Sequence, residues 1–179
     1  MKLYIGQFDQ ASQLLNEIKL HTVEPSHGHM ELDTGNPFYN EYVAQTKMLE
    51  DVGYDASTVE YRHYQSGKHF DKKYQEALGK LVGATPIMCW VSEIRPGKCT
   101  PWHWDINPWE EEHKKLGKLV RYFCFMSPPA VGHVFVTQDD AYYNEPQGAV
   151  YQYSHTREWH AGTNVGIVPK YLLTLTAYQ

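Results

Sequence analysis

The sequence predicts a mainly β protein, in which a sandwich or jelly roll of short strands is flanked by N-terminal helices packed outside it. From Pro86 onward, short apolar runs alternate with segments rich in Pro, Gly, Asn and Asp, which is typical of such folds. No helical pattern lies between these later runs, which disfavours a parallel α/β sheet. The high aromatic content, with 14 Tyr, 6 Phe and 5 Trp, also favours strands.

The individual elements follow from the spacing of the apolar residues. Five runs are predicted strands: residues 87–94, 119–126, 133–137, 149–153 and 171–178. Residues 8–20 and 69–82 carry apolar residues at helical spacing, and Asp9 is a candidate N-cap for the first of these helices. The charged segment 106–118 is a candidate lid over a site.

Length and composition limit what the protein can be. With 179 residues, of which 42% are hydrophobic and 21% charged, we expect one folded domain over 1–179, with a helical and irregular part (1–85) and a jelly-roll core (86–179). A net charge of −5 argues against nucleic acid or an anionic membrane as the main partner. No apolar run reaches the roughly 18 residues of a membrane span, and the first residues do not resemble a signal peptide. The 3 widely spaced cysteines fit reduced thiols in the cytoplasm.

The segment His103-Trp104-Asp105 is a candidate metal site. In an extended chain, residues two positions apart point to the same side, so this imidazole and this carboxylate can share one ion. A second histidine from a distant strand would complete a set of two His and one carboxylate, which suits non-haem Fe(II) oxygenase chemistry. His160 is the best candidate for that ligand, because it precedes the last predicted strand, and His133 and His155 are its rivals.

Two basic residues lie within apolar strand patterns. Arg121 shares a strand face with Phe123 and Phe125, and Lys170 shares one with Leu172. A cation buried without a partner costs several kcal/mol, so each must either pair with an internal Asp or Glu, face solvent, or bind an anion. Together with a metal site, the two cations indicate a dianionic small molecule such as a dicarboxylate cosubstrate.

The spacing of these residues resembles that of the aspartyl/asparaginyl β-hydroxylase family, whose members are Fe(II)- and 2-oxoglutarate-dependent oxygenases with a double-stranded β-helix fold. The similarity extends over residues 87–178, about half of the chain. The family pattern has a serine about eleven positions before the first histidine ligand, an arginine on the following strand, and a basic residue ten positions after the distal histidine. The matching residues are Ser92, His103, Arg121, His160 and Lys170, with Pro96 and Gly97 between the first two.

The resemblance implies a role for each of these residues. His103, Asp105 and His160 would bind Fe(II), and Ser92 and Lys170 would hold the distal carboxylate of 2-oxoglutarate. Arg121 would lie near the metal-chelating end of the cosubstrate. The family usually has arginine where Lys170 stands, and a lysine cannot form the bidentate contact of a guanidinium. In a rival arrangement, found in related jelly-roll oxygenases, Arg121 holds the distal carboxylate instead.

By this resemblance the protein is an oxygenase that uses Fe(II), O2 and 2-oxoglutarate and releases succinate and CO2. It would hydroxylate a C–H bond of an amino acid, a peptide or another small substrate. Two alternatives remain open. The chain could be a cupin-type metal-binding jelly roll with chemistry independent of 2-oxoglutarate. It could also be a non-enzymatic β-sandwich that serves as a binding module.

Overall fold

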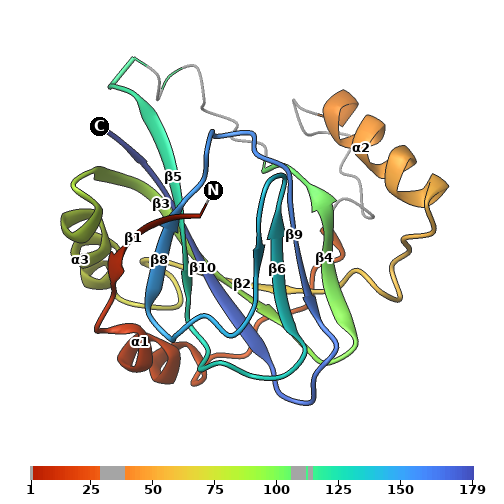
Figure 1. Ribbon diagram of the computed structural model, residues 1–179, viewed down its shortest axis with the longest axis horizontal. Coiled ribbons are helices and arrows are strands. Elements are labelled where there is room, and N and C mark those ends of the chain that lie inside the picture. The colour runs from red at the N-terminus through yellow and green to blue at the C-terminus, as the bar shows by residue number, and fades with distance from the viewer. Residues whose placement is uncertain (1, 29–38, 106–111, 113–114) are drawn as a thin grey trace.

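The computed structural model describes residues 2–28, 39–105, 112 and 115–179, and it contains two antiparallel β-sheets (Figure 1). The strands of the larger sheet are β1 (Leu3–Gln7), β2 (Arg62–Gln65), β3 (Thr85–Ile94), β5 (Leu119–Phe125), β8 (Ala149–Gln152) and β10 (Lys170–Tyr178). Those of the smaller sheet are β4 (Lys98–His103), β6 (His133–Thr137), β7 (Ala141–Tyr142) and β9 (His160–Asn164). The strand orders are β1-β8-β5-β10-β3-β2 and β4-β9-β6-β7.

From β3 onward the chain passes back and forth between the two sheets. The strands β3, β5, β8 and β10 lie in the larger sheet, and the strands that alternate with them in sequence lie in the smaller one. All pairings between these strands are antiparallel. Only β6 and β7, which are consecutive and pair with each other, break the alternation. This division of eight strands between two sheets is the arrangement of a jelly roll, or double-stranded β-helix. The predicted fold class is therefore confirmed.

Helices α1 (Ala11–Ile18) and α3 (Lys72–Val82) cover the outer face of the larger sheet (Figure 1). Leu14 of α1 and Leu78 of α3 share one buried apolar cluster with Val91 and Leu173 of the sheet. A further helix, α2 (Tyr39–Asp51), lies beside β4. The expected packing of N-terminal helices outside the sheets is thus confirmed for α1 and α3. No helix in the described part of the chain is long and apolar enough to cross a membrane.

The two outer helices begin in different ways. Asp71 is the N-cap of α3, and its side chain accepts a hydrogen bond of 2.9 Å from the backbone N–H of Lys73. Gln10 occupies the N-cap position of α1, and its side chain makes no capping hydrogen bond. The prediction that Asp9 caps this helix is wrong, because Asp9 lies one residue outside the position from which a side chain can reach the first turn.

The inner faces of the sheets hold an aromatic cluster and two cations. Phe123 and Phe125 of β5 pack with Phe135 of β6 in this cluster. Arg121 precedes Phe123 on the same strand, and both Arg121 and Lys170 are buried. The alternation of side chains along each strand therefore carries two positive charges into the interior, which excludes the alternative that they face solvent.

All five predicted strands form, within a few residues of their predicted ends. The expectation that residues 1–85 are only helical and irregular is wrong, because β1 pairs with β8 and β2 pairs with β3. Both are short, half-exposed or polar segments at the edges of the larger sheet, so neither has the apolar run that identifies an interior strand. β2 is the more important of the two, because it brings N-terminal residues next to the site.

Candidate metal centre

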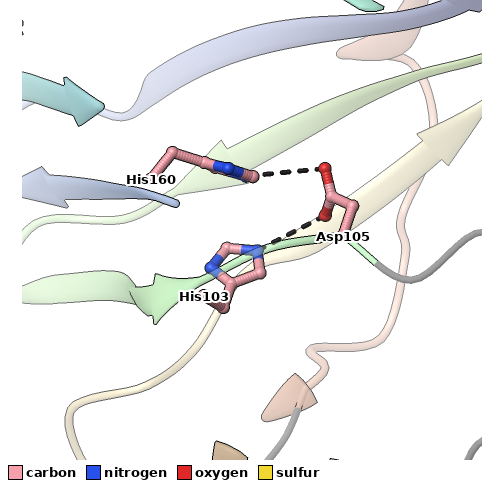
Figure 2. Close-up of side chains that lie close together, drawn as sticks. All are labelled: His103, Asp105 and His160. Atoms are coloured by element: carbon pink, nitrogen blue, oxygen red, sulfur yellow. Dashed lines mark ion pairs between the residues drawn. The ribbon is translucent and has the colours of Figure 1, made fainter. Parts of the chain in front are cut away.

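The three predicted metal ligands lie together at one end of the smaller sheet. His103 ends β4, His160 begins β9, and the two are directly paired across these strands. Asp105 lies just beyond the end of β4, and its carboxylate faces both imidazoles (Figure 2). Asp105 Oδ1 lies 3.4 Å from His103 Nε2, and Asp105 Oδ2 lies 3.4 Å from His160 Nε2. One donor atom from each residue falls within 4.8 Å of the others, which is close enough for all three to bind one ion.

The orientation of both imidazoles is set by backbone carbonyls. His103 Nδ1 lies 2.7 Å from the carbonyl oxygen of Pro101, and His160 Nδ1 lies 2.8 Å from that of Glu158. A carbonyl oxygen can only accept, so each Nδ1 carries a proton and donates it. The lone pair of each neutral ring is then on Nε2, the atom that faces Asp105. Burial and the neighbouring His103 lower the pKa of His160, which favours this neutral form.

Arg121 lies beside the acidic member of the triad. Its guanidinium donates a hydrogen bond to Asp105 Oδ2 and lies 5.6 Å from the ring centre of Trp90 and 5.4 Å from that of Tyr153. Burial alone would raise the pKa of Asp105, but Arg121 and His160 outweigh this effect and hold it well below its usual range. Asp105 is therefore ionised at neutral pH. The guanidinium of Arg121 is thus paired with an internal carboxylate that belongs to the candidate ligand set.

Lys170 lies further along the same interior and has no acidic partner among the described residues. Its side chain is buried, with the residue 1% exposed, and its ammonium group donates to the carbonyl oxygen of Val134. Burial lowers the pKa of Lys170 to about 7. A Cβ atom on Gly162 would lie 3.4 Å from Lys170 Nζ, so the absence of a side chain at that position leaves room for the ammonium group.

Ser92 lies close to Lys170 on the neighbouring strand. Ile94 of β3 pairs with Lys170 of β10, and Ser92 is two residues before Ile94, on the same face. Such diagonal neighbours are about 7–8 Å apart in an antiparallel sheet. Ser92 lines the cavity described below, as do Thr100 and Gly162.

The two rival histidines lie away from this cluster. His133 opens β6, as expected, but its Nε2 lies 3.0 Å from the carbonyl oxygen of Val168. His155 lies exposed in a bend before β9. Neither belongs to the group of potential ligands found among the described residues. Most of the candidate lid, residues 106–118, lies outside the described part of the chain.

A cavity of about 780 Å³ runs along the inner face of the larger sheet and includes the triad. His63 of β2 lines it, a residue that sequence analysis did not identify. The His63 ring centre lies 4.6 Å from that of Tyr61 and 6.2 Å from that of Trp90. Burial lowers the pKa of His63 to about 4, so this ring is neutral at physiological pH. The available signal was the alternation of Tyr61, His63 and Gln65, which places three polar or aromatic side chains on one strand face.

Comparison with known proteins identifies the fold and nothing finer. No protein-family model matches the chain, and no curated protein matches it in sequence. A prolyl-4-hydroxylase from Pseudomonas putida is similar in structure, with a TM-score of 0.50 and 11% identity over 95% of this chain and 100% of that one.

Two more distant structures are also similar. One is the viral collagen prolyl hydroxylase of Paramecium bursaria Chlorella virus 1 in complex with 2-oxoglutarate, with a TM-score of 0.42 and 13% identity over 90% of this chain and 99% of that one. The other is the DMSP lyase DddQ of Ruegeria pomeroyi, with a TM-score of 0.43 and 14% identity over 94% of this chain and 92% of that one.

Proposed function

We propose that the protein is an Fe(II)- and 2-oxoglutarate-dependent oxygenase of the aspartyl/asparaginyl β-hydroxylase type. It hydroxylates a C–H bond of an amino acid, a peptide or another small substrate. The observation that carries this proposal is the pairing of two features in one jelly-roll interior. Two imidazole Nε2 atoms and a carboxylate converge near one end of this interior. Lys170, which is buried and has no acidic partner among the described residues, lies further along it.

The donor set fits Fe(II). His103 and His160 each hold Nδ1 against a backbone carbonyl and leave Nε2 for the metal, and Asp105 adds one negative charge. Two imidazoles and one carboxylate on neighbouring strands leave positions free for other ligands, as non-haem iron oxygenases require. Arg121 binds Asp105 Oδ2 and so fixes the orientation of the carboxylate from outside the metal site.

Lys170 and Ser92 fit one carboxylate of 2-oxoglutarate. Gly162, which lies next to Lys170 Nζ, is two residues from His160 along β9, a rise of about 6.6 Å. This separation suits a small dicarboxylate that reaches the metal with one end and Lys170 with the other. Because Arg121 is already engaged with Asp105, the arrangement favours Lys170 over Arg121 as the partner of the distal carboxylate.

The bound groups supply the oxidising chemistry: 2-oxoglutarate, O2 and the substrate C–H bond give succinate, CO2 and the hydroxylated product. The chain supplies ligands from the triad, a positive charge from Lys170 and a cavity whose walls limit access of water. The three cysteines are unpaired, which fits the reducing cytoplasm that we propose as its location. We expect neither nucleic acid nor a membrane as a partner.

The test begins without oxygen. Fe(II) and 2-oxoglutarate added to the protein should produce the weak visible charge-transfer band of the chelate, and admitting oxygen should then yield succinate. His103→Ala should abolish both signals. His155→Ala is the matched control and should leave them unchanged, because this histidine is exposed and outside the cluster. A wild-type protein that shows neither band nor succinate would contradict the proposal.

A cupin-type enzyme that does not use 2-oxoglutarate is the second candidate. It is favoured by the lowered pKa of Lys170, because a lysine that is partly neutral near pH 7 can act as a base. The same experiment separates the two functions. Stoichiometric metal binding without any binding of 2-oxoglutarate would support this second function and exclude the first.

A further inference from the structure

The cavity extends beyond the triad to a polar mouth, which we define as Gln65, Ser66, Lys72 and Gln75. Gln65 ends β2, and Lys72 and Gln75 lie in the first turn of α3. Lys170 is far from this mouth along the sheet. Gln65 pairs with Trp90 on β3, whereas Lys170 pairs with Ile94, four residues further along that strand. At about 3.4 Å per residue, the two levels of the sheet are about 14 Å apart.

One buried polar atom at this mouth has no hydrogen-bond partner within the described protein. Ser66 Oγ is fully buried and makes no hydrogen bond there. His63 also lines the cavity, and its ring packs against those of Tyr61 and Trp90. Buried polar groups are nearly always satisfied, so groups of this kind on a cavity wall indicate a polar ligand.

The charge of the cavity wall indicates the sign of that ligand. Among the described lining residues, Asp105 is the one carboxylate, and it is already paired with Arg121. Lys72 is the cation at the mouth, and no ion pair to it is found in the described structure. A ligand that reaches the mouth therefore meets an uncompensated positive charge, which favours an anionic group.

We propose that the mouth binds the prime substrate, and that this substrate is a small molecule carrying a carboxylate or phosphate group. Lys72 neutralises the anionic group, and Ser66 and Gln75 donate hydrogen bonds to it. The remainder of the molecule extends past His63 towards the triad. Tyr42 of α2 and Gly28 also line the cavity, so several N-terminal segments enclose it, and this enclosure favours a small molecule over a protein surface. This inference rests on the proposed function.

The experiment uses protein loaded with Mn(II) and 2-oxoglutarate, which binds ligands without turnover. The probes are the free L-amino acids with their matching carboxamides, and simple phosphate monoesters, each titrated by calorimetry. We expect at least one acid or monoester to bind, and a bound amino acid to lose about tenfold in affinity as its amide, as for one charge-assisted contact. Lys72→Met should cause a similar loss while leaving the affinities for Mn(II) and 2-oxoglutarate unchanged.

Lys73→Met is the matched control. Lys73 is the next residue of α3, and its Nζ lies 3.7 Å from Asp71 Oδ2. It does not line the cavity, so its replacement should leave probe binding unchanged. If the protein binds Mn(II) and 2-oxoglutarate but none of the anionic probes, or if the two lysine variants behave alike, this inference is wrong and the proposed function stands. If the wild-type protein does not bind 2-oxoglutarate, the proposed function and this inference fall together.

Discussion

At the scale of single residues, Lys170 combines a stability cost with a binding role. Its ammonium group is buried without an acidic partner among the described residues. We predict that Lys170→Met, which keeps the length of the side chain and removes the charge, raises the free energy of unfolding by about 1 kcal/mol. The melting temperature should rise by about 2–4 °C. The same variant should lose 2-oxoglutarate binding and retain metal binding.

Lys118→Met is the control for this effect, because Lys118 is exposed and its replacement should change stability by less than about 0.5 kcal/mol. Differential scanning calorimetry measures both variants. A melting temperature that falls in Lys170→Met would show that the buried lysine stabilises the fold, contrary to this account.

The pH dependence of 2-oxoglutarate binding should also follow Lys170. Burial lowers the pKa of Lys170 to about 7, so above this pH the free protein holds mostly neutral lysine. The dianion 2-oxoglutarate binds the protonated lysine. Lys170 therefore takes up a proton when the complex forms above pH 7. We predict that affinity is greatest below about pH 7 and falls by up to tenfold per unit as the pH rises further. Calorimetric titrations across this range measure it. An affinity that stays constant or increases from neutral to alkaline pH would contradict the role of Lys170.

Sequence reasoning worked well for residues with a chemical pattern and failed for those placed by strand pairing. His103 and Asp105 are two residues apart, and Lys170 interrupts an apolar strand, so both signals are local. His63 has a weaker signal, the alternation of polar and aromatic residues along one short segment, which does not show what that segment pairs with. It reaches the cavity because β2 pairs with β3 at the edge of the larger sheet, and the short polar segment that forms β2 does not reveal this pairing.

At the scale of elements, the N-cap of α3 gives a direct test of the fold. Asp71 accepts a hydrogen bond from the first turn of α3, whereas Asp9 makes no such contact with α1. We predict that Asp71→Ala lowers the free energy of unfolding by about 1 kcal/mol, and that Asp9→Ala changes it by less than about 0.5 kcal/mol. Urea denaturation compares the two. Equal losses would mean that Asp9 caps α1, as the sequence predicted and contrary to the structure.

The strands divide by composition into those that were predictable and those that were not. β5 and β10 are buried along almost their whole length, and such continuous apolar runs are recognisable without a structure. β9, with the sequence HAGTN, has no apolar run and is fixed by β4 and β6 on its two sides. The strands that carry the ligands are therefore among the least predictable, because ligand positions replace apolar ones.

At the scale of the whole molecule, we propose that residues 1–179 form a single domain, because α1 and α3 share their apolar cluster with the larger sheet. The ligands should then stabilise the entire fold. In the proposed function, Fe(II) and 2-oxoglutarate would bind groups contributed by strands of both sheets, and binding at about 100 times the dissociation constant would add about 2.7 kcal/mol. We predict a rise in melting temperature of about 5–10 °C when both are added without oxygen.

His160→Ala should remove this rise, because it deletes one of the three metal ligands. His133→Ala is the comparison for this variant, since His133 contacts a backbone carbonyl away from the triad. A wild-type protein whose melting temperature does not respond to the two ligands together would show that they do not bind the folded state. The jelly roll itself was predictable from the alternation of strands and turns, but the way in which the N-terminal part completes the cavity was not.

Whether His103, Asp105 and His160 hold one metal ion can be measured by anomalous X-ray diffraction from crystals soaked anaerobically with Fe(II). We predict one iron peak bonded to both Nε2 atoms and to a carboxylate oxygen of Asp105. A peak elsewhere, or none at this cluster under saturating Fe(II), would contradict it.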